Sequence, residues 1–519
     1  MRRTSRRWPV MAAVTVALVL PLTGPASPAA ADPDPAALAK SITAPGVKQH
    51  LRKFQQIADA NGGTRASGRP GFDASVDYVA GKLRKAGYKV TVQPFEFPYF
   101  EQLSVPVLER VSPSPRVFTP TPLSGTPIGE FDTMTQSGSG DVTGTLYNID
   151  LTLPPAPAPS STSGCEASDF AGFPAGGIAL MQRGTCNFIV KVQNAVAAGA
   201  AGAIIFNEGQ PGRTATLQGN LGVPVGIPVL GAGFDAGQNL AATAGSVIHM
   251  KTETISQVRT TYNVLADSRW GDGNKIVQLG AHLDSVLAGP GINDNGSGTA
   301  GILEVALKLG ALPTRNKLRF SFWGAEELNL LGSTHYVATL PPAELAKIKL
   351  YLNFDMIASP NYALQVYDGD NSDAVGAGPG PEGSAEIEKL FEKYFDVLRQ
   401  PHIGTDFTGR SDYGPFIAVG IPAGGLFTGA EVLKTPEQAA LFGGTAGQPF
   451  DGCYHQSCDT IANINDKALA LNTGAIATAA VVYAYSGDLP GPDTRPAATA
   501  LRTQPTTDDH HDDHHGVHH

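Results

Sequence analysis

The C-terminal half of the chain alternates short apolar runs with segments of helical periodicity, and this alternation restricts the possible folds most strongly. The predicted strands are residues 276–279, 318–322 and 350–354, and the predicted helices are 299–309, 384–398 and 468–485. Alternation of this kind predicts an α/β fold, with a central mixed, largely parallel sheet flanked by helices on both faces.

Acids and histidines follow the predicted strands directly. His282 and Asp284 come just after the first strand, Glu326 and Glu327 after the second, and Asp355 after the third. Because the carboxyl ends of parallel strands meet at one edge of an open α/β sheet, we expect these side chains to lie together in a crevice there.

Two further segments, GINDNGSG with Asp294 and CYHQSC with His455, complete a set of metal ligands. Two divalent ions about 3.5–4 Å apart need a bridging carboxylate and roughly two more nitrogen or oxygen ligands each. Glu326 is surplus to that number and is placed to act as a base. Burying so many polar groups for unrelated reasons would be costly, which favours a shared site. The five expected metal ligands are His282, Asp294, Glu327, Asp355 and His455.

The first 31 residues have the three parts of a secretory signal peptide: basic residues, an apolar run at about 10–22, and small residues ending at Ala31. We expect cleavage before Asp32 and a secreted, extracellular protein. The apolar run is too short to span a membrane, and no later segment offers about 18 uninterrupted apolar residues. The sequence therefore predicts a chain without a membrane span.

Charge excludes one class of partner. Removing the four arginines of the signal peptide from the 37 basic residues leaves 33 against 47 acidic residues, a net charge of −14. Phosphate binding needs concentrated positive charge, so a nucleic-acid partner is not expected. The Pro-rich tail, residues 488–519, ends in interleaved histidines and aspartates, and we predict it to be disordered, with a metal-scavenging role left open.

Four cysteines allow three pairings. The simplest is Cys165–Cys186 with Cys453–Cys458. Export into an oxidising compartment favours disulfides over thiolate metal sites. The second pair would close a tight loop around His455 and stiffen it, although a purely structural role is an equal alternative.

The motifs, their order and their spacing resemble those of the secreted co-catalytic dinuclear zinc aminopeptidases of the Streptomyces and Aeromonas kind, and most of all the aminopeptidase Y type. The resemblance covers the mature chain except its tail. It implies the zinc exopeptidase fold and two zinc ions per chain. It also implies that His282 and Asp355 hold one ion, that Glu327 and His455 hold the other, and that Asp294 bridges them.

The same resemblance implies the activity and further roles. The expected reaction is hydrolysis of N-terminal, large apolar residues from peptides by a water activated between two zinc ions, with Glu326 as general base. Asp284 would orient His282 by accepting a hydrogen bond from its far nitrogen. Tyr454 would hydrogen-bond the developing oxyanion, with a merely buried, satisfied hydroxyl as the alternative.

Two substrate-binding residues are also implied. Arg410, in GRSDYGPF, matches an arginine thought to help with the tetrahedral intermediate, and an ion pair with Asp406 or Asp412 is the alternative. Phe427, in GLFTGAE, would line the pocket for the N-terminal side chain, although apolar residues on strands more often belong to the core.

A second resemblance lies within the first. GGIALMQRGTCNFIVKVQNAVAAGAAGAIIFNE followed by IPVLGA resembles the protease-associated domain, an α/β module inserted into several exopeptidase families. None of its residues forms a catalytic set, so we interpret it as a lid or substrate-access module. The predicted organisation is signal peptide 1–31, N-terminal part of the peptidase domain 32–129, protease-associated domain 130–255, catalytic domain 256–487 and tail 488–519.

Two local features carry their own expectations. The resemblance implies a non-proline cis peptide after Asp294. The acidic segment 368–373 could bind Ca²⁺, but it lacks the bidentate glutamate of an EF-hand loop, so a solvated turn is the stronger interpretation.

Two rival functions remain open. A glutamate-carboxypeptidase-like enzyme would share the metal ligands, but it would need several arginines to bind a substrate carboxylate, and only Arg410 is an obvious candidate. A non-catalytic protein like the transferrin receptor ectodomain would have lost ligands, and this chain has them all. We expect a monomer acting on peptides with a free N-terminus.

Overall fold

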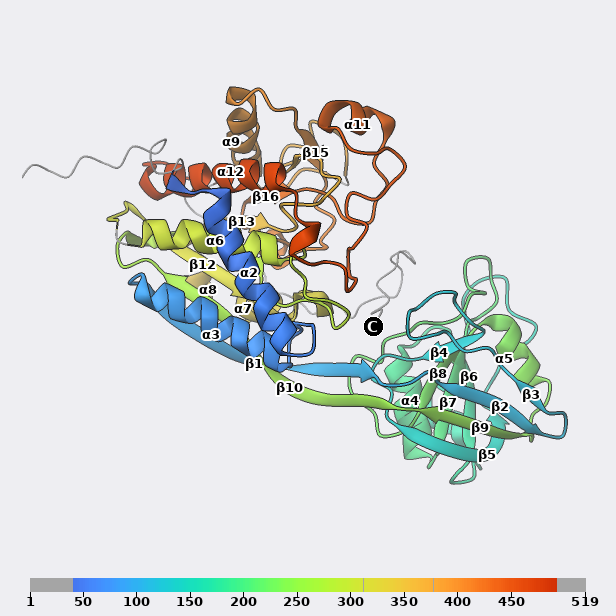
Figure 1. Cartoon of the computed structure of the whole chain (residues 1–519). Helices are drawn as coiled ribbons and strands as arrows, with labels where there is room; N and C mark the ends of the chain where they lie inside the picture. The colour runs from blue at the N-terminus through green and yellow to red at the C-terminus, as the bar shows by residue number, and fades with distance from the viewer. Residues whose placement is uncertain (1–40, 311, 377, 492–519) are drawn as a thin grey trace, which may run out of the picture.

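The computed structural model describes residues 41–310, 312–376 and 378–491 as two bodies joined by a pair of long strands (Figure 1). The predicted signal peptide, its cleavage site before Asp32 and the tail from residue 492 onward lie outside the described residues.

Within the described residues, the larger body is built on an eight-stranded mixed sheet of order β1-β10-β12-β11-β13-β16-β14-β15. The neighbouring strands β12, β11, β13 and β16 are all parallel to one another. The strand bounds are β1 Lys89–Gln102, β10 Thr254–Asp267, β11 Asp272–His282, β12 Asn316–Trp323, β13 Ile348–Phe354, β14 Gln365–Tyr367, β15 Ile403–Thr405 and β16 Ala423–Phe427.

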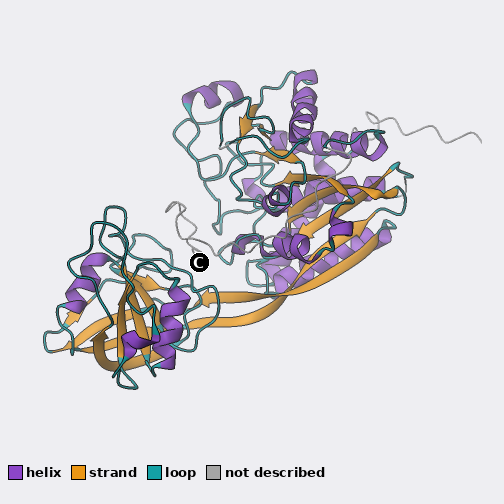
Figure 2. Ribbon diagram, turned by 180° about the vertical axis from the view of Figure 1, so that it is seen from behind, coloured by secondary structure: helices purple, strands orange, loops and turns teal. Residues whose placement is uncertain are grey.

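Helices cover both faces of this sheet (Figure 2), which confirms the predicted α/β fold. Alternation along the strands supplies both cores: Leu350 and Leu352 of β13 pack into one, and Tyr351 packs into the other with Trp323. The helices of the first face are α2 Ala44–Ala60, α3 Pro70–Lys85, α6 Gly296–Leu309, α9 Ser384–Val397 and α12 Asp466–Tyr485, and those of the second are α7 Leu331–Thr339, α8 Pro342–Leu345 and α10 Gly414–Ala418.

Helix α12 is long and apolar enough, by length and composition, to cross a membrane. It is not an uninterrupted apolar run, since it contains Asn472, Thr473 and Thr478. However, 67% of its apolar window is buried, and it packs against α6, α9 and β12. The helix is therefore apolar because it is a core helix of the larger body.

In the described part of the chain, the smaller body has its own eight-stranded sheet, of order β3-β2-β9-β5-β6-β7-β8-β4, in which β5 to β8 are parallel. Its strands are β2 Val107–Ser112, β3 Arg116–Val117, β4 Phe131–Thr133, β5 Gly140–Asn148, β6 Ile178–Gln182, β7 Gly202–Phe206, β8 Val229–Ala232 and β9 Val247–Thr252. Its helices are α4 Phe188–Ala197 and α5 Phe234–Ala241, with a short 3-10 turn at Ala167–Phe170.

The structure moves the boundary of the smaller body. Strands β2 and β3 precede residue 130 but belong to its sheet, because β2 pairs with β9. The connection to the larger body is made by β1 and β10, which pair antiparallel over their whole length from Lys89–Asp267 to Gln102–Thr254 (Figure 1). The insertion therefore leaves and re-enters the larger body on one two-stranded ribbon.

Both predicted disulfides are present. Cys165–Cys186 lies in the smaller body, and Cys453–Cys458 closes a loop of the larger body over a sequence separation of 5. The pairing predicted as the simplest of the three is confirmed.

Candidate metal centre

The predicted ligands lie at the carboxyl ends of adjacent parallel strands. His282 is the last residue of β11, and Asp355 follows β13 directly. Glu326 and Glu327 open the 3-10 turn η2 (Glu326–Leu328) just after β12. The strand ends therefore bring together side chains that are far apart in sequence, as the alternation of strands and helices predicted.

Unusual backbone turns aim these side chains inward. Ala325 precedes Glu326 with φ 53°, Met356 follows Asp355 with φ 44°, and His455 itself has φ 56°. A non-glycine residue in this left-handed region costs on the order of 1–3 kcal/mol and persists where the surrounding packing enforces it. Three such residues therefore lie at or next to the predicted ligands.

The ligand atoms converge around Asp294. His282 Nε2 lies 3.2 Å from Asp294 Oδ1 and 3.4 Å from Asp355 Oδ1. His455 Nε2 lies 3.2 Å from the other oxygen, Asp294 Oδ2, and 3.0 Å from Glu327 Oε2. The two oxygens of Asp294 thus face different histidines, which is the arrangement that a bridging carboxylate requires.

The donor atoms fit zinc, since all are imidazole nitrogens or carboxylate oxygens. Ligand atoms of His282, Asp294 and Glu327 lie within 4.8 Å of one another, as do those of His282, Glu326 and Asp355. Among the described residues, Glu327 Oε1 and Asp355 Oδ1 are buried without a hydrogen-bond partner. Two dications would take up these oxygens.

The pKa shifts of the buried glutamates also indicate a site for cations. Burial raises the pKa of Glu326 well above its ordinary value, and the carboxylates of Asp412 and Asp355 add to the effect. Burial likewise raises the pKa of Glu327, with Asp294 adding to it. Carboxylates this crowded and buried need cations beside them to remain ionised together.

The loop that carries Asp294 is held by its backbone. The Asp294–Asn295 peptide is cis, as the resemblance implied. Asp459 Oδ1 accepts a hydrogen bond from the Asn293 N–H at 2.9 Å, and Asp459 Oδ2 accepts one from the Asp294 N–H at 3.0 Å. Burial disfavours the charged form of Asp294, but hydrogen bonds from His282 and His455 outweigh it and lower the pKa.

The disulfide loop presents His455 to this site. The rings of Tyr454 and His455 stack with centroids 3.8 Å apart, inside the Cys453–Cys458 loop. The loop is also joined to the Asp294 segment, because Asp451 accepts hydrogen bonds from both the Cys453 N–H and the Asn293 Nδ2. Hydrogen bonds to Asp451 therefore connect the segment that carries His455 with the segment that carries Asp294.

Asp284 lies beside His282, but not in the expected hydrogen bond. The nearest acceptor to His282 Nδ1 is the main-chain oxygen of Asp284, at 3.2 Å, while its carboxylate Oδ1 lies at 3.6 Å. The same Oδ1 accepts a hydrogen bond from the Glu326 N–H at 3.3 Å. The backbone carbonyl thus contacts the imidazole, and the carboxylate holds the turn that carries Glu326.

Arg410 lies at the edge of the site in a different pairing from those considered. Its Nη1 contacts Glu431 Oε1 at 2.8 Å, so neither Asp406 nor Asp412 is its salt-bridge partner. Arg410 and Tyr454 lie close enough to interact electrostatically, and burial of Arg410 opposes the rise in its pKa that Tyr454 and Glu431 cause. Burial and the charge of Asp294 raise the pKa of Tyr454 well above its ordinary value, so this hydroxyl keeps its proton and can donate it in a hydrogen bond.

Phe427 is half-buried at the end of β16, next to the ligand-bearing strand β13. Ser411 was not predicted as a site residue, yet its Oγ donates to Asp355 Oδ2 at 2.6 Å and accepts from Asn353 Nδ2 at 2.8 Å. Ser411 stands next to Arg410 in GRSDYGPF. The signal was present in that motif, but a serine hydroxyl is too common to single out.

The acidic turn at 368–373 packs against α9. Carboxylate oxygens of Asp368, Asp370 and Glu388 lie within 4.8 Å of one another. Backbone N–H groups already satisfy several of them: Ser372 donates to Asp368 at 2.9 Å and Gly369 donates to Glu388 at 2.9 Å. These contacts describe a self-contained turn, and Ca²⁺ binding stays a prediction.

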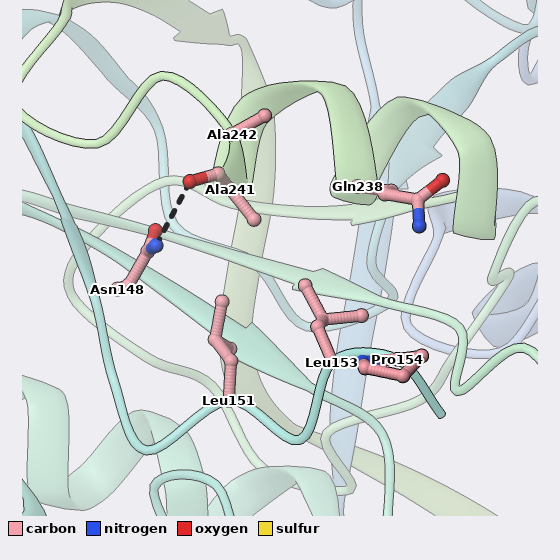
Figure 3. A pocket seen from close by; sticks show the side chains of 7 residues that line it. All are labelled: Asn148, Leu151, Leu153, Pro154, Gln238, Ala241 and Ala242. Carbon is pink, nitrogen blue, oxygen red and sulfur yellow. Dashed lines mark hydrogen bonds between the residues drawn. The ribbon is translucent and has the colours of Figure 1, made fainter. Parts of the chain in front are cut away.

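A separate hollow of about 530 Å³ lies on the smaller body, between the end of β5 and α5 (Figure 3). Asn148 donates to the Ala241 main-chain oxygen across one side of it, at 3.0 Å, and Leu151 and Leu153 form another side. Its lining residues include no titratable side chain, so the hollow has no acid–base chemistry to compare with the metal centre.

Comparisons with known proteins agree with this geometry. Residues 263–480 match peptidase family M28, and residues 142–240 match the PA domain. The aminopeptidase of Pseudomonas aeruginosa is 50% identical over 450 residues, covering 85% of this chain and 81% of that protein. Leucine aminopeptidase 2 of Trichophyton rubrum is 52% identical over 340 residues, covering 65% of this chain and 68% of that protein.

Solved structures show the same fold. An aminopeptidase from Aneurinibacillus sp. strain AM-1 superimposes with a TM-score of 0.61 at 26% identity, covering 88% of this chain and 97% of that one. A zinc aminopeptidase from Bacillus subtilis superimposes with a TM-score of 0.54 at 25% identity, with the same coverage of 88% and 97%.

Proposed function

The chain belongs to peptidase family M28, carries an inserted PA domain and is an aminopeptidase, and from that premise we propose that it is an exported enzyme with two zinc ions per chain that releases large apolar residues from peptide N-termini. The observation that carries the proposal is the position of Asp294, whose two oxygens each lie 3.2 Å from a different histidine nitrogen.

The donor set divides between the two ions. His282 and Asp355 would hold one, Glu327 and His455 the other, and Asp294 both, in keeping with the contacts among these side chains. Bound zinc supplies Lewis acidity toward the scissile carbonyl and a nucleophile at neutral pH. Rivals that lack the metal ligands are disfavoured, because every expected ligand is present and converges.

Protein side chains move the protons in this proposal. Glu326 takes a proton from the attacking water as the carbon–oxygen bond forms, and returns it to the leaving amine as the carbon–nitrogen bond breaks. The Tyr454 hydroxyl, near Asp294 and Glu327, donates a hydrogen bond to the developing oxyanion. The carboxylates of Glu326 and Asp355 would bind the free N-terminal amine.

Substrate preference and export rest on separate support. Leucine aminopeptidase 2 of Trichophyton rubrum is named for an apolar N-terminal residue, and Phe427 supplies an apolar surface at the end of β16. Two disulfides and the signal-peptide pattern of residues 1–31 support export, because disulfides persist in oxidising compartments.

The purified mature protein should hydrolyse leucine p-nitroanilide but not its N-acetylated form, because the carboxylates of the site need a free amine. A chelator should abolish the activity, and added zinc should restore it. Release of p-nitroaniline, followed at 25 °C with and without chelator, measures both effects.

Three results would contradict the proposal in different ways. Cleavage of the N-acetylated substrate would contradict the proposed recognition of the free amine. Full activity after exhaustive chelation would contradict the proposed requirement for zinc. Inactivity on leucine together with cleavage of a C-terminal glutamate from a peptide would favour the carboxypeptidase-like rival.

Tyr454→Phe should lower kcat by about 10²–10³-fold, the typical cost of removing one donor to an oxyanion. The control is Tyr88→Phe, which removes a buried hydroxyl that donates to the Ala306 main-chain oxygen at 2.8 Å on α6. That variant should lose about 1 kcal/mol of stability and keep its kcat. Equal kcat values for both variants would leave Tyr454 as a structural residue.

A further inference from the structure

Arg65 is a fully buried cation that connects the N-terminal helices with the metal centre. It lies between α2 and α3, in the segment Thr64–Arg69, and its side chain is 0% exposed. Its guanidinium carbon stands 5.0 Å from the centre of the Phe54 ring on α2. Gly71, in the first turn of α3, fixes the segment, because a Cβ there would come within 2.1 Å of the Thr64 main-chain oxygen.

The guanidinium binds main-chain oxygens at both ends of the loop between β11 and α6, which joins His282 to Asp294. One N–H donates to Leu283, between His282 and Asp284. Nε donates to the Pro290 oxygen at 2.8 Å and Nη2 to the Gly291 oxygen at 2.6 Å, both shortly before Asp294.

Thr64 and the backbone of Arg65 make further hydrogen bonds to the same β11–α6 loop. Arg65 N–H donates to Ser285 Oγ at 3.0 Å, and Ser285 Oγ donates in turn to the Gly289 oxygen at 2.9 Å. Thr64 Oγ1 donates to the Val286 oxygen at 2.7 Å. Both ends of residues 283–291 are therefore tied to one short segment of the N-terminal region.

The packing around Arg65 leaves little room for another arrangement. Gly291 has φ +59°, and a Cβ there would come within 2.4 Å of the Asp294 oxygen and 3.3 Å of Arg65 Nη2. The Gly291 oxygen also accepts from the Gly296 N–H at the start of α6. The carbonyl that binds Arg65 thus also fixes the turn from Asp294 into α6.

The charge of Arg65 matches its surroundings. Burial lowers the pKa of Arg65 to about 10, and the carboxylates of Asp284, Asp459 and Asp294 oppose that shift. The group therefore stays cationic at neutral pH, close to the acids of the metal centre but hydrogen-bonded to neutral carbonyls. Among the described residues Arg65 forms no salt bridge, so its hydrogen bonds hold the β11–α6 loop rather than one carboxylate.

We propose that Arg65 is a positioning residue for the metal centre, which holds the two ends of the β11–α6 loop, and with them His282 and Asp294, at the spacing that two zinc ions require. The inference rests on the proposed function, since it concerns the affinity of the same site for zinc. Lysine cannot replace arginine in this role, because its single ammonium cannot reach carbonyls at both ends of the loop in the fixed directions of a guanidinium.

The test is Arg65→Lys in the full mature chain, with zinc binding measured by chelator competition and the visible spectrum of the cobalt-substituted protein recorded. Residues that orient metal ligands typically change affinity by about 10–100-fold, so the dissociation constant for zinc should rise by that factor. The cobalt bands should shift, because they report the geometry of the ligands.

The matched control is Arg110→Lys in the smaller body. Arg110 is also buried and bonded to neutral acceptors, the Ser114 oxygen and the side chains of Asn239 and Thr243. This variant should bind zinc as the unmodified protein does. A purely structural Arg65 would lower the thermal midpoint of Arg65→Lys and leave the zinc constant and the cobalt spectrum unchanged, which would overturn the inference.

Ser285→Ala tests the same proposal if the Arg65→Lys protein does not fold. It removes the hydroxyl that accepts from the Arg65 N–H, and weaker zinc binding with an unchanged midpoint in chelator supports the inference. Unchanged binding overturns it. Failure of the unmodified protein to bind zinc would instead reject the proposed function, so the two failures are distinguishable.

Discussion

Glu326→Gln is expected to lower kcat by about 10²–10⁴-fold while both zinc ions stay bound. The amide keeps the shape of the side chain but cannot accept the proton of the attacking water. Glu326 is 8% exposed, and its Oε2 lies 3.6 Å from His282 Nε2. The carboxylate therefore lies in the metal centre, but farther from His282 than the carboxylates of Asp294 and Asp355 do. Leucine p-nitroanilide kinetics and zinc analysis of the same sample measure both quantities.

Glu304→Gln is the control for this substitution. Glu304 is also 8% exposed in the larger body, but it lies on α6 and pairs with His50 at 3.2 Å rather than with a metal ligand. Its variant should keep kcat. Because Glu326 also clusters with His282 and Asp355, a Glu326→Gln protein that has lost one zinc would show that Glu326 is a ligand and would contradict its role as base.

The convergence of the ligands could be predicted because the positions of the strands along the chain are encoded locally. The apolar runs of β11, β12 and β13 are short and bounded, so the residues after them are placed at one edge by the geometry of parallel sheets. The ends of the long ribbon were harder. β1 contains Pro94 and Pro98, which lack an N–H group, and it tolerates them because it is an edge strand.

Contacts made through the backbone left no signal in the sequence. Arg65 binds the main-chain oxygens of Leu283, Pro290 and Gly291, and any residue could supply such an oxygen. The ion-pair alternative considered for Arg410 named other acids, for a related reason. Glu431 lies 21 residues away, after β16, and only the fold brings it within 2.8 Å.

Asp294→Asn should remove most of the bound zinc and lower kcat/KM by about 10³-fold or more, because both ions lose a ligand. An amide offers one neutral oxygen where the carboxylate offers two charged ones, and each Asp294 oxygen faces its own histidine. A shared carboxylate also offsets the repulsion between two dications, so its loss weakens both sites together. Zinc content after gel filtration and leucine p-nitroanilide kinetics measure the two effects.

The loop itself should survive the change, because Asp459 holds the backbone N–H groups of Asn293 and Asp294 and does not depend on the Asp294 side chain. Asp284→Asn is the matched control, since its carboxylate contacts the Glu326 N–H rather than facing two histidines. That variant should keep both ions, and its kcat/KM should fall by only about 10–100-fold. If Asp294→Asn instead kept one tightly bound zinc with substantial activity, the two ions would be independent and Asp294 would not bridge them.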